Sequence, residues 1–273
     1  MIAAILRAPV YSPNHIGIDA DILNLTAEQL RRRGHRVRIL SEEDLIGAGD
    51  IEEETVVHMC RHQRSLEILA EKEARGATVV NSAASVENCL RERVARILLG
   101  SGIAFPDSLV VQTDTVVTAD MEAAGLSEVW IKRGDTFPRH REDITFVRTP
   151  AQAQQIVQEY FLRGIKRAVI SRHMPGRLIQ FYGVGSAGYY SCLGPDGHRA
   201  PSELAERMRS LAVRAAEALE TDIYGGQAIL GADERLTIVD FNDFPSFAPV
   251  VKEASRAIAR ALLSAMKGDR GRS

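Results

Sequence analysis

Hydrophobic residues in the first third of the chain fall into short continuous runs separated by stretches with helical spacing. The continuous runs lie at residues 2–6, 37–40, 55–59 and 78–80. Between them, residues 20–33 and 65–75 carry apolar side chains at the spacing of an amphipathic helix. Short buried runs that alternate with such helices are typical of a parallel sheet covered by helices. The pattern predicts a parallel α/β domain over residues 1–82.

Beyond residue 82 the expected strands tend to follow one another without an intervening helix. Helices are expected at residues 85–99, 150–163 and 202–220 and from Pro249 onward, and strands at residues 108–111, 129–132, 145–148, 168–172, 178–184, 224–230 and 236–242. The polar turn at residues 231–234 predicts that the last two strands are antiparallel. We divide this α+β half into a central subdomain, 83–165, a C-terminal subdomain, 166–266, and a charged tail, 267–273, that is expected to be disordered.

Composition and charge exclude several classes of protein. The chain of 273 residues has a formal net charge of −2, so it has no general electrostatic attraction to nucleic acid or membrane. No apolar run approaches the ~20 residues that span a bilayer, and the apolar start is too short for a signal peptide. Cys60, Cys89 and Cys192 are widely separated, which argues against a disulfide framework or a zinc site. We expect a cytoplasmic protein without nucleic-acid or membrane partners.

Near the end of the chain, a β-type run delivers two oxygen-bearing side chains. Asp240 and Asn242 follow residues 236–239 and point the same way in a strand, because alternate residues share a face. Such oxygens suit a hard cation such as Mg²⁺. Gln227, in the strand expected to pair with this one, would face the same site or occupy an ordinary polar position of the sheet. An edge strand that enters an Asx-Pro turn at Pro245 is equally consistent with these residues alone.

Lys132 ends an apolar strand and precedes the polar loop 134–142. An ammonium at a strand end beside a flexible loop suits contact with phosphate oxygens, and a solvated lysine is the alternative. The loop contains Arg139, His140 and Arg141, so it would close over a polyanion or form an exposed hairpin tip. The chain has no P-loop and no G-x-S-x-G motif.

The order of these pieces resembles the ATP-grasp superfamily, in particular its glutathione synthetase-like and ribosomal-protein glutamate ligase-like members. The motifs that carry the resemblance are Asn81-Ser82, Arg91-Glu92-Arg93, Gly102-Ile103 with Pro106, the Lys132 strand, residues 168–174, Gly225-Gly226-Gln227, and Asp240-Phe241-Asn242 with Pro245-Ser246-Phe247. They cover about residues 78–250, and the preceding α/β domain is similar to the usual N-terminal domain. The resemblance implies an α/β domain followed by an α+β ATP-grasp fold, with nucleotide bound between two subdomains at an antiparallel sheet.

The resemblance also implies an enzyme that uses ATP and Mg²⁺ to join a carboxylate to an amine. The carboxylate attacks the γ-phosphate to give an acylphosphate, the amine displaces phosphate, and ADP is released. The implied small-molecule partners are of amino-acid or peptide type. Many superfamily members are dimers or tetramers, so the resemblance allows a homo-oligomer, which the sequence does not fix.

Roles carry over to residues of this chain as follows. Lys132, Arg93 and Arg139 are the implied catalytic residues, with Lys132, Arg93 and Gln180 at phosphate, Arg172, His173 and Met174 at adenine, and Asp240, Asn242 and Gln227 at the metal. Arg7, Arg61 and Arg64 stand at expected strand ends of the first domain, where open α/β sheets bind ligands. We expect them to hold an anionic co-substrate, and solvated arginines are the alternative for each.

The chain departs from the superfamily pattern at three positions. Arg93 stands in place of a lysine, and Gln180 stands where relatives often have a basic residue. Gln227 stands in place of an aspartate, which removes a negative charge and predicts weaker metal binding. Two alternatives therefore stay open. One is a small-molecule kinase of the inositol-phosphate kinase type, whose basic loop binds a phosphorylated acceptor. The other is a nucleotide-binding relative without turnover.

Overall fold

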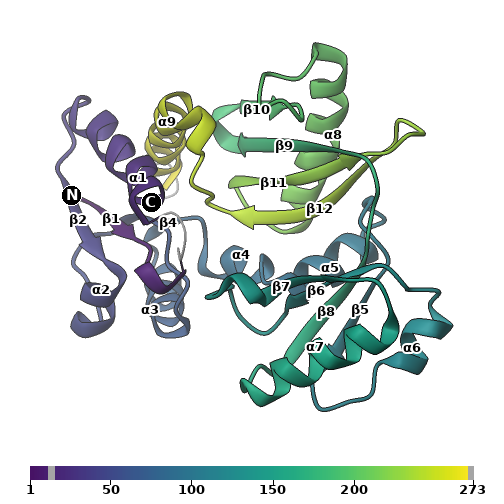
Figure 1. Ribbon diagram of the computed structural model, residues 1–273. Coiled ribbons are helices and arrows are strands. Elements are labelled where there is room, and N and C mark those ends of the chain that lie inside the picture. Colours follow the sequence, from purple (N-terminus) through teal and green to yellow (C-terminus); the bar gives the residue numbers. More distant parts are fainter. Residues whose placement is uncertain (12–15, 270–273) are drawn as a thin grey trace.

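The computed structural model describes residues 1–11 and 16–269, which form three four-stranded sheets (Figure 1). One sheet is parallel and belongs to the N-terminal part of the chain. The other two are antiparallel and follow it, as the sequence predicted for an α/β domain followed by an α+β half. Among the described residues, no helix combines the length and the apolar character that a bilayer crossing requires.

The parallel sheet has the strand order β2-β1-β3-β4. Its strands are β1 (Ile2–Leu6), β2 (Val37–Ser41), β3 (Thr55–His58) and β4 (Thr78–Val80), and its helices are α1 (Ile16–Arg31), α2 (Glu42–Ala48) and α3 (Gln63–Ala74), with a 3₁₀ turn η1 (Pro9–Tyr11) after β1. Strand β1 is buried over Ile2–Ile5 because helices cover both faces of the sheet. Helix α2 was not predicted. It begins at a capping box formed by Ser41 and Asp44.

The last helix, α9 (Val251–Asp269), returns to the N-terminal domain and packs along α1. Its apolar side chains, including Ala254, Ile258 and Leu262, share one buried cluster with Ile22 and Leu30 of α1. The predicted boundary placed this segment with residues 166–266; α9 packs both on the first domain and on Val184 and Ile223 of the C-terminal region, which belong to the same buried cluster. The predicted tail also begins as helix at residues 267–269. Residues 270–273 lie outside the described residues.

Two short helices, α4 (Ala83–Asn88) and α5 (Arg91–Gly100), replace the single helix predicted at residues 85–99. The chain is extended at Leu90, which separates them. Cys89 packs into the core beneath the C-terminal sheet, whereas Leu90 packs against the core of the N-terminal domain. Because of this break, the adjacent residues Cys89 and Leu90 pack into two different cores. The break also changes which face of α5 each side chain occupies.

The second sheet has the strand order β5-β8-β6-β7, and α6 and α7 cover one of its faces (Figure 1). Its elements are β5 (Ser108–Gln112), α6 (Thr118–Ala123), β6 (Val129–Arg133), η2 (Arg141–Asp143), β7 (Ile144–Val147), α7 (Pro150–Leu162) and β8 (Arg167–Arg172). Thr149 caps α7 through its side chain, which accepts from the N–H of Gln152. Val129 and Ile131 are fully buried toward the helices, so Lys132, on the alternate face, points away from them.

The third sheet has the strand order β10-β9-β11-β12. Its elements are β9 (Arg177–Val184), η3 (Gly185–Ala187), β10 (Tyr189–Leu193), α8 (Ser202–Ala218), β11 (Ile223–Leu230), β12 (Leu236–Asp243) and η4 (Ala248–Val250). Strands β11 and β12 are antiparallel, as the turn at residues 231–234 predicted. Strand β10 was not predicted. Strands β8 and β9 are consecutive in sequence but belong to different sheets, so residues 173–176 form the connection between the two sheets.

Polar contacts tie the N-terminal domain to the third sheet. Asn81 Nδ2 donates to the carbonyl of Ile223 at 2.8 Å, and Asn81 Oδ1 accepts from the N–H of the same residue at 2.8 Å. His58 Nε2 lies 2.8 Å from the carbonyl of Asn81. The N–H of Cys60 donates to His58 Nδ1, so Nε2 carries the proton of a neutral ring. Burial lowers the pKa of His58 to about 4, which keeps the ring neutral.

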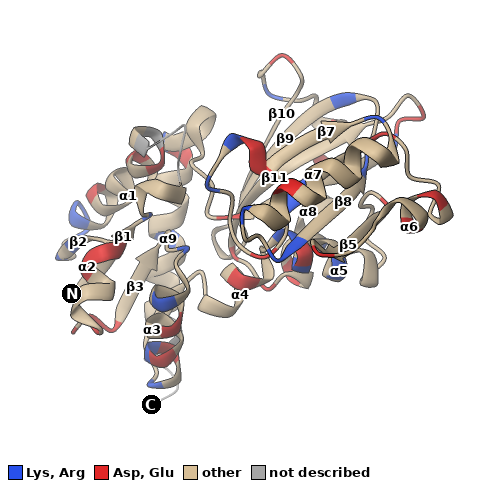
Figure 2. Ribbon diagram, turned by 60° about the horizontal axis from the view of Figure 1, so that its bottom comes forward, with Lys and Arg blue, Asp and Glu red and all other residues tan. Residues whose placement is uncertain are grey.

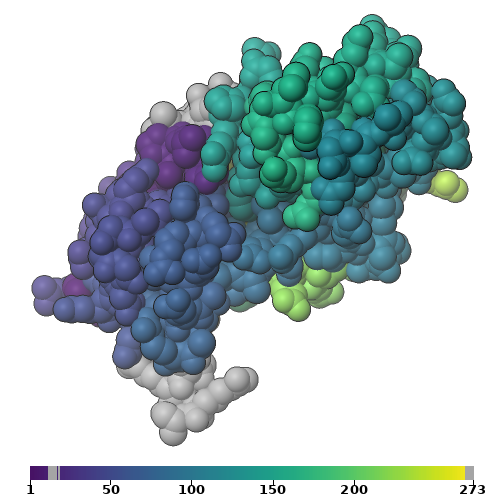
Figure 3. Space-filling model, turned by 90° about the horizontal axis from the view of Figure 1, so that it is seen from below, coloured from purple at the N-terminus to yellow at the C-terminus, as the bar shows by residue number. Residues whose placement is uncertain are grey.

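Charged and apolar residues are distributed as this architecture requires. Figure 2 shows Lys, Arg, Asp and Glu along α3, whereas β1 and β3 are mainly uncharged. From below, the N-terminal domain and the second sheet with its helices make up most of the surface, and only small parts of the C-terminal region reach it (Figure 3). The second sheet thus lies beside the first domain as well as opposite the third sheet.

Candidate active site

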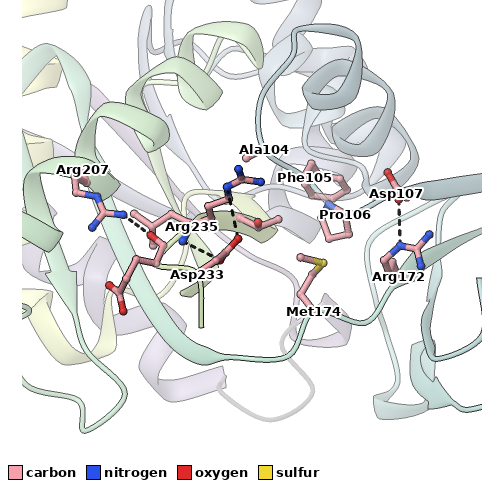
Figure 4. Close-up of a pocket in the computed structure, with 12 residues that line it drawn as sticks. Ala104, Phe105, Pro106, Asp107, Arg172, Met174, Arg207, Asp233 and Arg235 are labelled. Atoms are coloured by element: carbon pink, nitrogen blue, oxygen red, sulfur yellow. Dashed lines mark hydrogen bonds and ion pairs between the residues drawn. The ribbon is translucent and has the colours of Figure 1, made fainter. Parts of the chain in front are cut away.

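A cavity of about 720 Å³ opens where the second and third sheets meet (Figure 4). Its walls come from Phe105, Pro106 and Asp107 before β5, from Arg172 and Met174 after β8, from Arg207 of α8, and from residues 233–237 of the β11–β12 turn and β12. Figure 4 shows Met174 between the two walls. The cleft leads inward to a smaller space that Phe105 also lines, together with Arg91, Lys132 and Asp240.

Lys132 lies at this inner end. Its Nζ donates to the carbonyl of Val239 at 2.7 Å and lies 3.8 Å from Asp240 Oδ1. The side chain is 12 % exposed. Burial, and secondarily the charge of Arg91, lowers the pKa of Lys132, while Asp240 opposes the change. A desolvated ammonium with one distant carboxylate has donors left for a further anion. The predicted position of Lys132 at a strand end therefore places it inside the cleft.

Arg91, rather than Arg93, is the arginine beside Lys132. Arg91 Nε lies 4.0 Å from Asp240 Oδ1, and its Nε and Nη1 are buried without a hydrogen-bond partner. Arg93 is exposed and pairs with Glu87 at 3.1 Å. Residues two positions apart on an α-helix are rotated by about 200° about its axis, so the two guanidinium groups leave α5 on opposite faces.

A signal in the sequence distinguishes these two arginines. Arg91 stands three residues before Val94 and seven before Leu98, both buried, so it shares the apolar face of α5. Arg93 stands three residues before Arg96, and both are exposed. Motif order alone pointed to Arg93. The helical pattern, with a break at Leu90, gives the register that the structure shows.

The oxygens predicted to hold a metal are assembled on one face of the third sheet. Asn242 Nδ2 donates to Asp240 Oδ2 at 2.8 Å, so the two side chains do share a face. Strand register places Gln227 opposite Asp240 and Gln180 opposite Gln227. Directly paired residues of antiparallel strands project to the same side. One carboxylate and neighbouring amides therefore form a row across β12, β11 and β9.

This row fits a hard cation in donor chemistry, although with little charge. Carboxylate and amide oxygens are suitable ligands for Mg²⁺, which keeps water or phosphate oxygens as further ligands. Among residues 1–11 and 16–269, no group of three or more His, Cys, Asp or Glu side chains is arranged to bind a metal. Any divalent cation here would depend on Asp240, on amides and on the phosphates of a nucleotide.

Gly226 permits the close approach of strands that forms this row. A Cβ atom at Gly226 would lie 2.3 Å from the carbonyl oxygen of Asp240 and 2.6 Å from the ring of Phe181. A side chain at this position would push β12 away from β11. The glycine thus holds the backbone of Asp240 against its neighbour, beside the bulge that follows Gln227.

The residues predicted to contact adenine lie at the outer end of the cleft. Met174 lines the large cavity. Arg172 also lines it, but its guanidinium is bound to Asp107 at 3.1 Å and to the carbonyl of Gly125 at 3.0 Å. His173 Nδ1 accepts from Trp130 Nε1 at 3.1 Å. The side chains of Arg172 and His173 are therefore engaged with the second sheet, and Met174 is the predicted contact that faces the space.

The arginines of the first domain are used differently from the predicted binding role. Arg7 Nη1 binds Asp19 at 2.9 Å, and its Nη2 binds the carbonyl of Phe244 at 2.9 Å. Burial lowers the pKa of Arg7 to about 10, with a contribution from the neighbouring Arg61. Arg64 is half exposed and pairs with Glu67 at 3.2 Å. Arg7 is thus engaged inside the protein, whereas Arg64 is engaged in an ion pair on the surface.

Arg61 forms the strongest of these internal contacts. Its Nη1 lies 2.5 Å from Asp243 Oδ2, and its Nη2 donates to the Asp243 carbonyl at 2.8 Å. The two side chains are 5 % and 2 % exposed. Since Asp243 directly follows Asn242, Arg61 joins the N-terminal domain to the end of the candidate metal strand.

Glu42 holds the loops of the first domain in place and was not found from the sequence. Its buried carboxylate accepts from the N–H groups of Ala8, Arg61 and His62 at 3.0, 2.6 and 2.6 Å, and from the hydroxyl of Ser65 at 2.5 Å. These donors follow β1 and β3. One carboxylate thus fixes the loops at the carboxyl edge of the parallel sheet, where such sheets bind ligands.

Several solved structures are similar to this chain over nearly its whole length. A D-alanine–D-alanine ligase from Coxiella burnetii matches with a TM-score of 0.77 and 13 % identity over 99 % of this chain and 96 % of that chain. A Bacillus anthracis D-alanine–D-alanine ligase complexed with ATP matches with a TM-score of 0.76 and 12 % identity, over 100 % and 99 % of the two chains. A RimK domain ATP-grasp protein from Sphaerobacter thermophilus matches with a TM-score of 0.70 and 18 % identity, over 96 % and 100 %.

The chain has the ATP-grasp fold, as the order of its motifs predicted. The sequence matches no protein-family model and no curated protein sequence. The identities to the solved structures are low, so the likeness establishes the fold alone. The chemistry has to be argued from the residues in the cleft.

Proposed function

We propose that the protein is an ATP-dependent ligase that joins a carboxylate to an amine and releases ADP and phosphate. The observation that carries this proposal is the pair of buried cations, Arg91 and Lys132, at the inner end of the cleft beside Asp240. The nucleotide would lie between the second and third sheets, with its base near Met174 and its phosphates toward the cations. The likeness to ligases, one of them complexed with ATP, supports the same reading.

Each cation has a defined part in this reaction. Lys132 would exchange its contact with the Val239 carbonyl for a phosphate oxygen, and Arg91 would use its two unpartnered nitrogens. Because both groups are held in place before the substrate arrives, they stabilise charge that develops on the phosphates without reorganising. We assign to Arg91 the role that motif order suggested for Arg93. Gln180 is directly paired with Gln227, so it lies on the same side of the third sheet.

Asp240, Asn242 and Gln227 are the residues that would hold Mg²⁺. The cation would offset charge on the β- and γ-phosphates. The carboxylate substrate attacks the γ-phosphorus, which breaks the bond to ADP and gives an acylphosphate. The amine then attacks the acyl carbon and phosphate leaves. The residues of this chain bind and orient the phosphates during both steps.

ADP release tests the proposal. The full chain would be incubated with ATP, Mg²⁺ and a matrix of amino acids and small carboxylic acids. We expect ADP release that requires one carboxylate, and a hydroxamate when hydroxylamine replaces the amine. ADP release with a phosphorylated product that survives hydroxylamine would identify a kinase instead. ATP binding without ADP release across the matrix would contradict catalysis.

A further inference from the structure

The loop 134–142 carries a guanidinium with donors to spare. Arg139 Nη2 donates to the hydroxyl of Tyr11 at 3.2 Å, and the guanidinium carbon lies 5.3 Å from the centre of the Tyr11 ring. Arg139 Nε is buried and has no hydrogen-bond partner. A buried donor left without an acceptor is unfavourable, so this nitrogen is suited to an acceptor supplied from outside the chain.

Within residues 1–11 and 16–269, no acidic side chain forms an ion pair with Arg139. Asp143, four residues further along the chain, binds Arg163 with its side chain and lies 3.9 Å from Arg133. Asp143 reaches Arg139 only through the backbone N–H, at 2.8 Å. Among the ion pairs of the described residues, none includes Arg139. Arg139 therefore differs from Arg7 and Arg61, which each have a buried carboxylate partner.

The loop is held firmly enough to position this group. Phe137 is 9 % exposed and belongs to the buried cluster of the N-terminal domain that also contains Tyr11. The guanidinium of Arg61 lies over the Phe137 ring at 4.4 Å from its centre. The loop that leaves the Lys132 strand is thus anchored on the first domain by an aromatic side chain, two residues before Arg139.

These contacts place Arg139 between the nucleotide cleft and the first domain. Its loop leaves the strand of Lys132, and Tyr11 follows β1 at the carboxyl edge of the parallel sheet. Arg61, which touches Phe137, is bound to Asp243 beside Asn242. A group held by Arg139 and Tyr11 would therefore be close to the candidate phosphate site without occupying it.

The chemistry of the pair favours a carboxylate. A guanidinium binds a carboxylate through parallel N–H donors, and Nε is one of the donors left here. The Tyr11 hydroxyl accepts from Arg139 and keeps its own proton to donate. One cation and one hydroxyl balance a single negative charge, whereas a phosphate dianion leaves a charge uncompensated. We infer that Arg139 and Tyr11 form the subsite for a carboxylate of the acceptor substrate, an inference that rests on the proposed ligase function.

Steady-state kinetics test this inference in the full chain. The probe is the carboxylic acid that supports ADP release in a panel of the common L-amino acids, D-alanine, D-serine, succinate and glutarate, with O-phosphoserine and glycerol phosphate as phosphate arms. We expect Arg139→Met to raise the KM for that acid at least tenfold, and Tyr11→Phe to raise it severalfold, with the dissociation constant of ATP changed less than twofold. Arg139→Lys should recover part of the loss.

Arg148→Met is the matched control, because Arg148 is exposed in the same subdomain and its loss changes the charge equally. Equal KM values for Arg139→Met and Arg148→Met would overturn the inference and leave the ligase proposal standing. A phosphate monoester that supports ADP release where no carboxylate does would overturn the assignment to carboxylate. If Arg139→Met lowers the melting temperature, the KM of the more conservative variant Tyr11→Phe is used instead. An unchanged KM in Tyr11→Phe would contradict the subsite.

Discussion

The carboxyl edge of the parallel sheet and the cleft between the antiparallel sheets both gather arginines, but they use them in opposite ways. At the sheet edge, Arg7 and Arg61 bind buried carboxylates and backbone carbonyls, so their donors are consumed within the protein. In the cleft, Arg91 and Lys132 share Asp240 at 4.0 and 3.8 Å and retain free donors. The same residue type is structural where it is fully paired and suited to ligands where it is not.

Removing Arg61 should give the largest effect. Arg61→Met leaves Asp243 buried without its partner, and breaking such a pair typically costs about 3–5 kcal/mol of unfolding free energy. Chemical denaturation would measure it. Arg64→Met is the control, since its exposed pair should contribute less than about 1 kcal/mol. Arg61→Met with Asp243→Leu should recover much of the loss, because both charges are then gone. A loss no greater than that of Arg64→Met would contradict a structural role for Arg61.

The polar junction between the N-terminal domain and the third sheet, where His58 contacts Asn81, should be sensitive to acid. His58 has a folded pKa of about 4, against about 6.5 when unfolded. As the pH falls from 6.5 toward 4, the unfolded chain takes up a proton that the folded chain does not, so stability is lost. The loss should reach about 3 kcal/mol, at 1.36 kcal/mol per pKa unit.

Denaturation at a series of pH values would show this loss as a difference between the wild type and His58→Gln. His198→Gln is the control, because His198 is exposed. Parallel profiles for the wild type and His58→Gln would mean that His58 does not link the junction to pH.

In the cleft the effect should fall on ligand binding instead of stability. Lys132→Met should weaken Mg·ATP binding roughly 10- to 100-fold, the value of one charge-assisted hydrogen bond. Stability should be maintained, since burial disfavours the charged form of Lys132. Calorimetry and melting curves of Lys132→Met and of the exposed control Lys166→Met measure both quantities. Equal ATP affinities, or a large loss of stability in Lys132→Met, would place Lys132 among the structural cations.

A smaller change should sharpen the metal assignment. Gln227→Asp adds a carboxylate opposite Asp240, and we expect Mg²⁺ to bind about tenfold more tightly in the presence of ATP. Without metal, the two facing carboxylates should lower the melting temperature, and Mg²⁺ should restore it. Gln112→Asp, at an exposed strand end, is the control for added charge. No difference in Mg²⁺ dependence between the two variants would exclude Gln227 from the site.

The sequence predicted the fold and the cleft better than it predicted which charged side chains pair with one another. Parallel and antiparallel regions follow from local apolar patterns, and Lys132, Asp240 and Asn242 follow from strand ends and alternation. Long-range pairing left no local trace. Asp19 and Asp243 neutralise Arg7 and Arg61 across 12 and 182 residues, so the sequence could not show that these arginines are consumed.

The position of Arg91 on the buried face of α5 was missed for a different reason. The break at Leu90 has no proline or glycine, and it exists because Cys89 and Leu90 pack into different cores. The spacing of Val94 and Leu98 places Arg91 on the apolar face of α5, but motif order alone did not use that signal. The tertiary packing shows where α5 begins, and it agrees with this spacing.

The central claim is that the cleft between the antiparallel sheets binds ATP through its unpaired cations. Calorimetric titration of Mg·ATP into the wild type, Arg91→Met and Arg93→Met tests it most directly, because the two variants remove the same charge from one helix. We expect the wild type to bind Mg·ATP, with an affinity that Arg91→Met weakens at least tenfold and that Arg93→Met leaves within about twofold. Absence of binding to the wild type, or equal losses in the two variants, would contradict it.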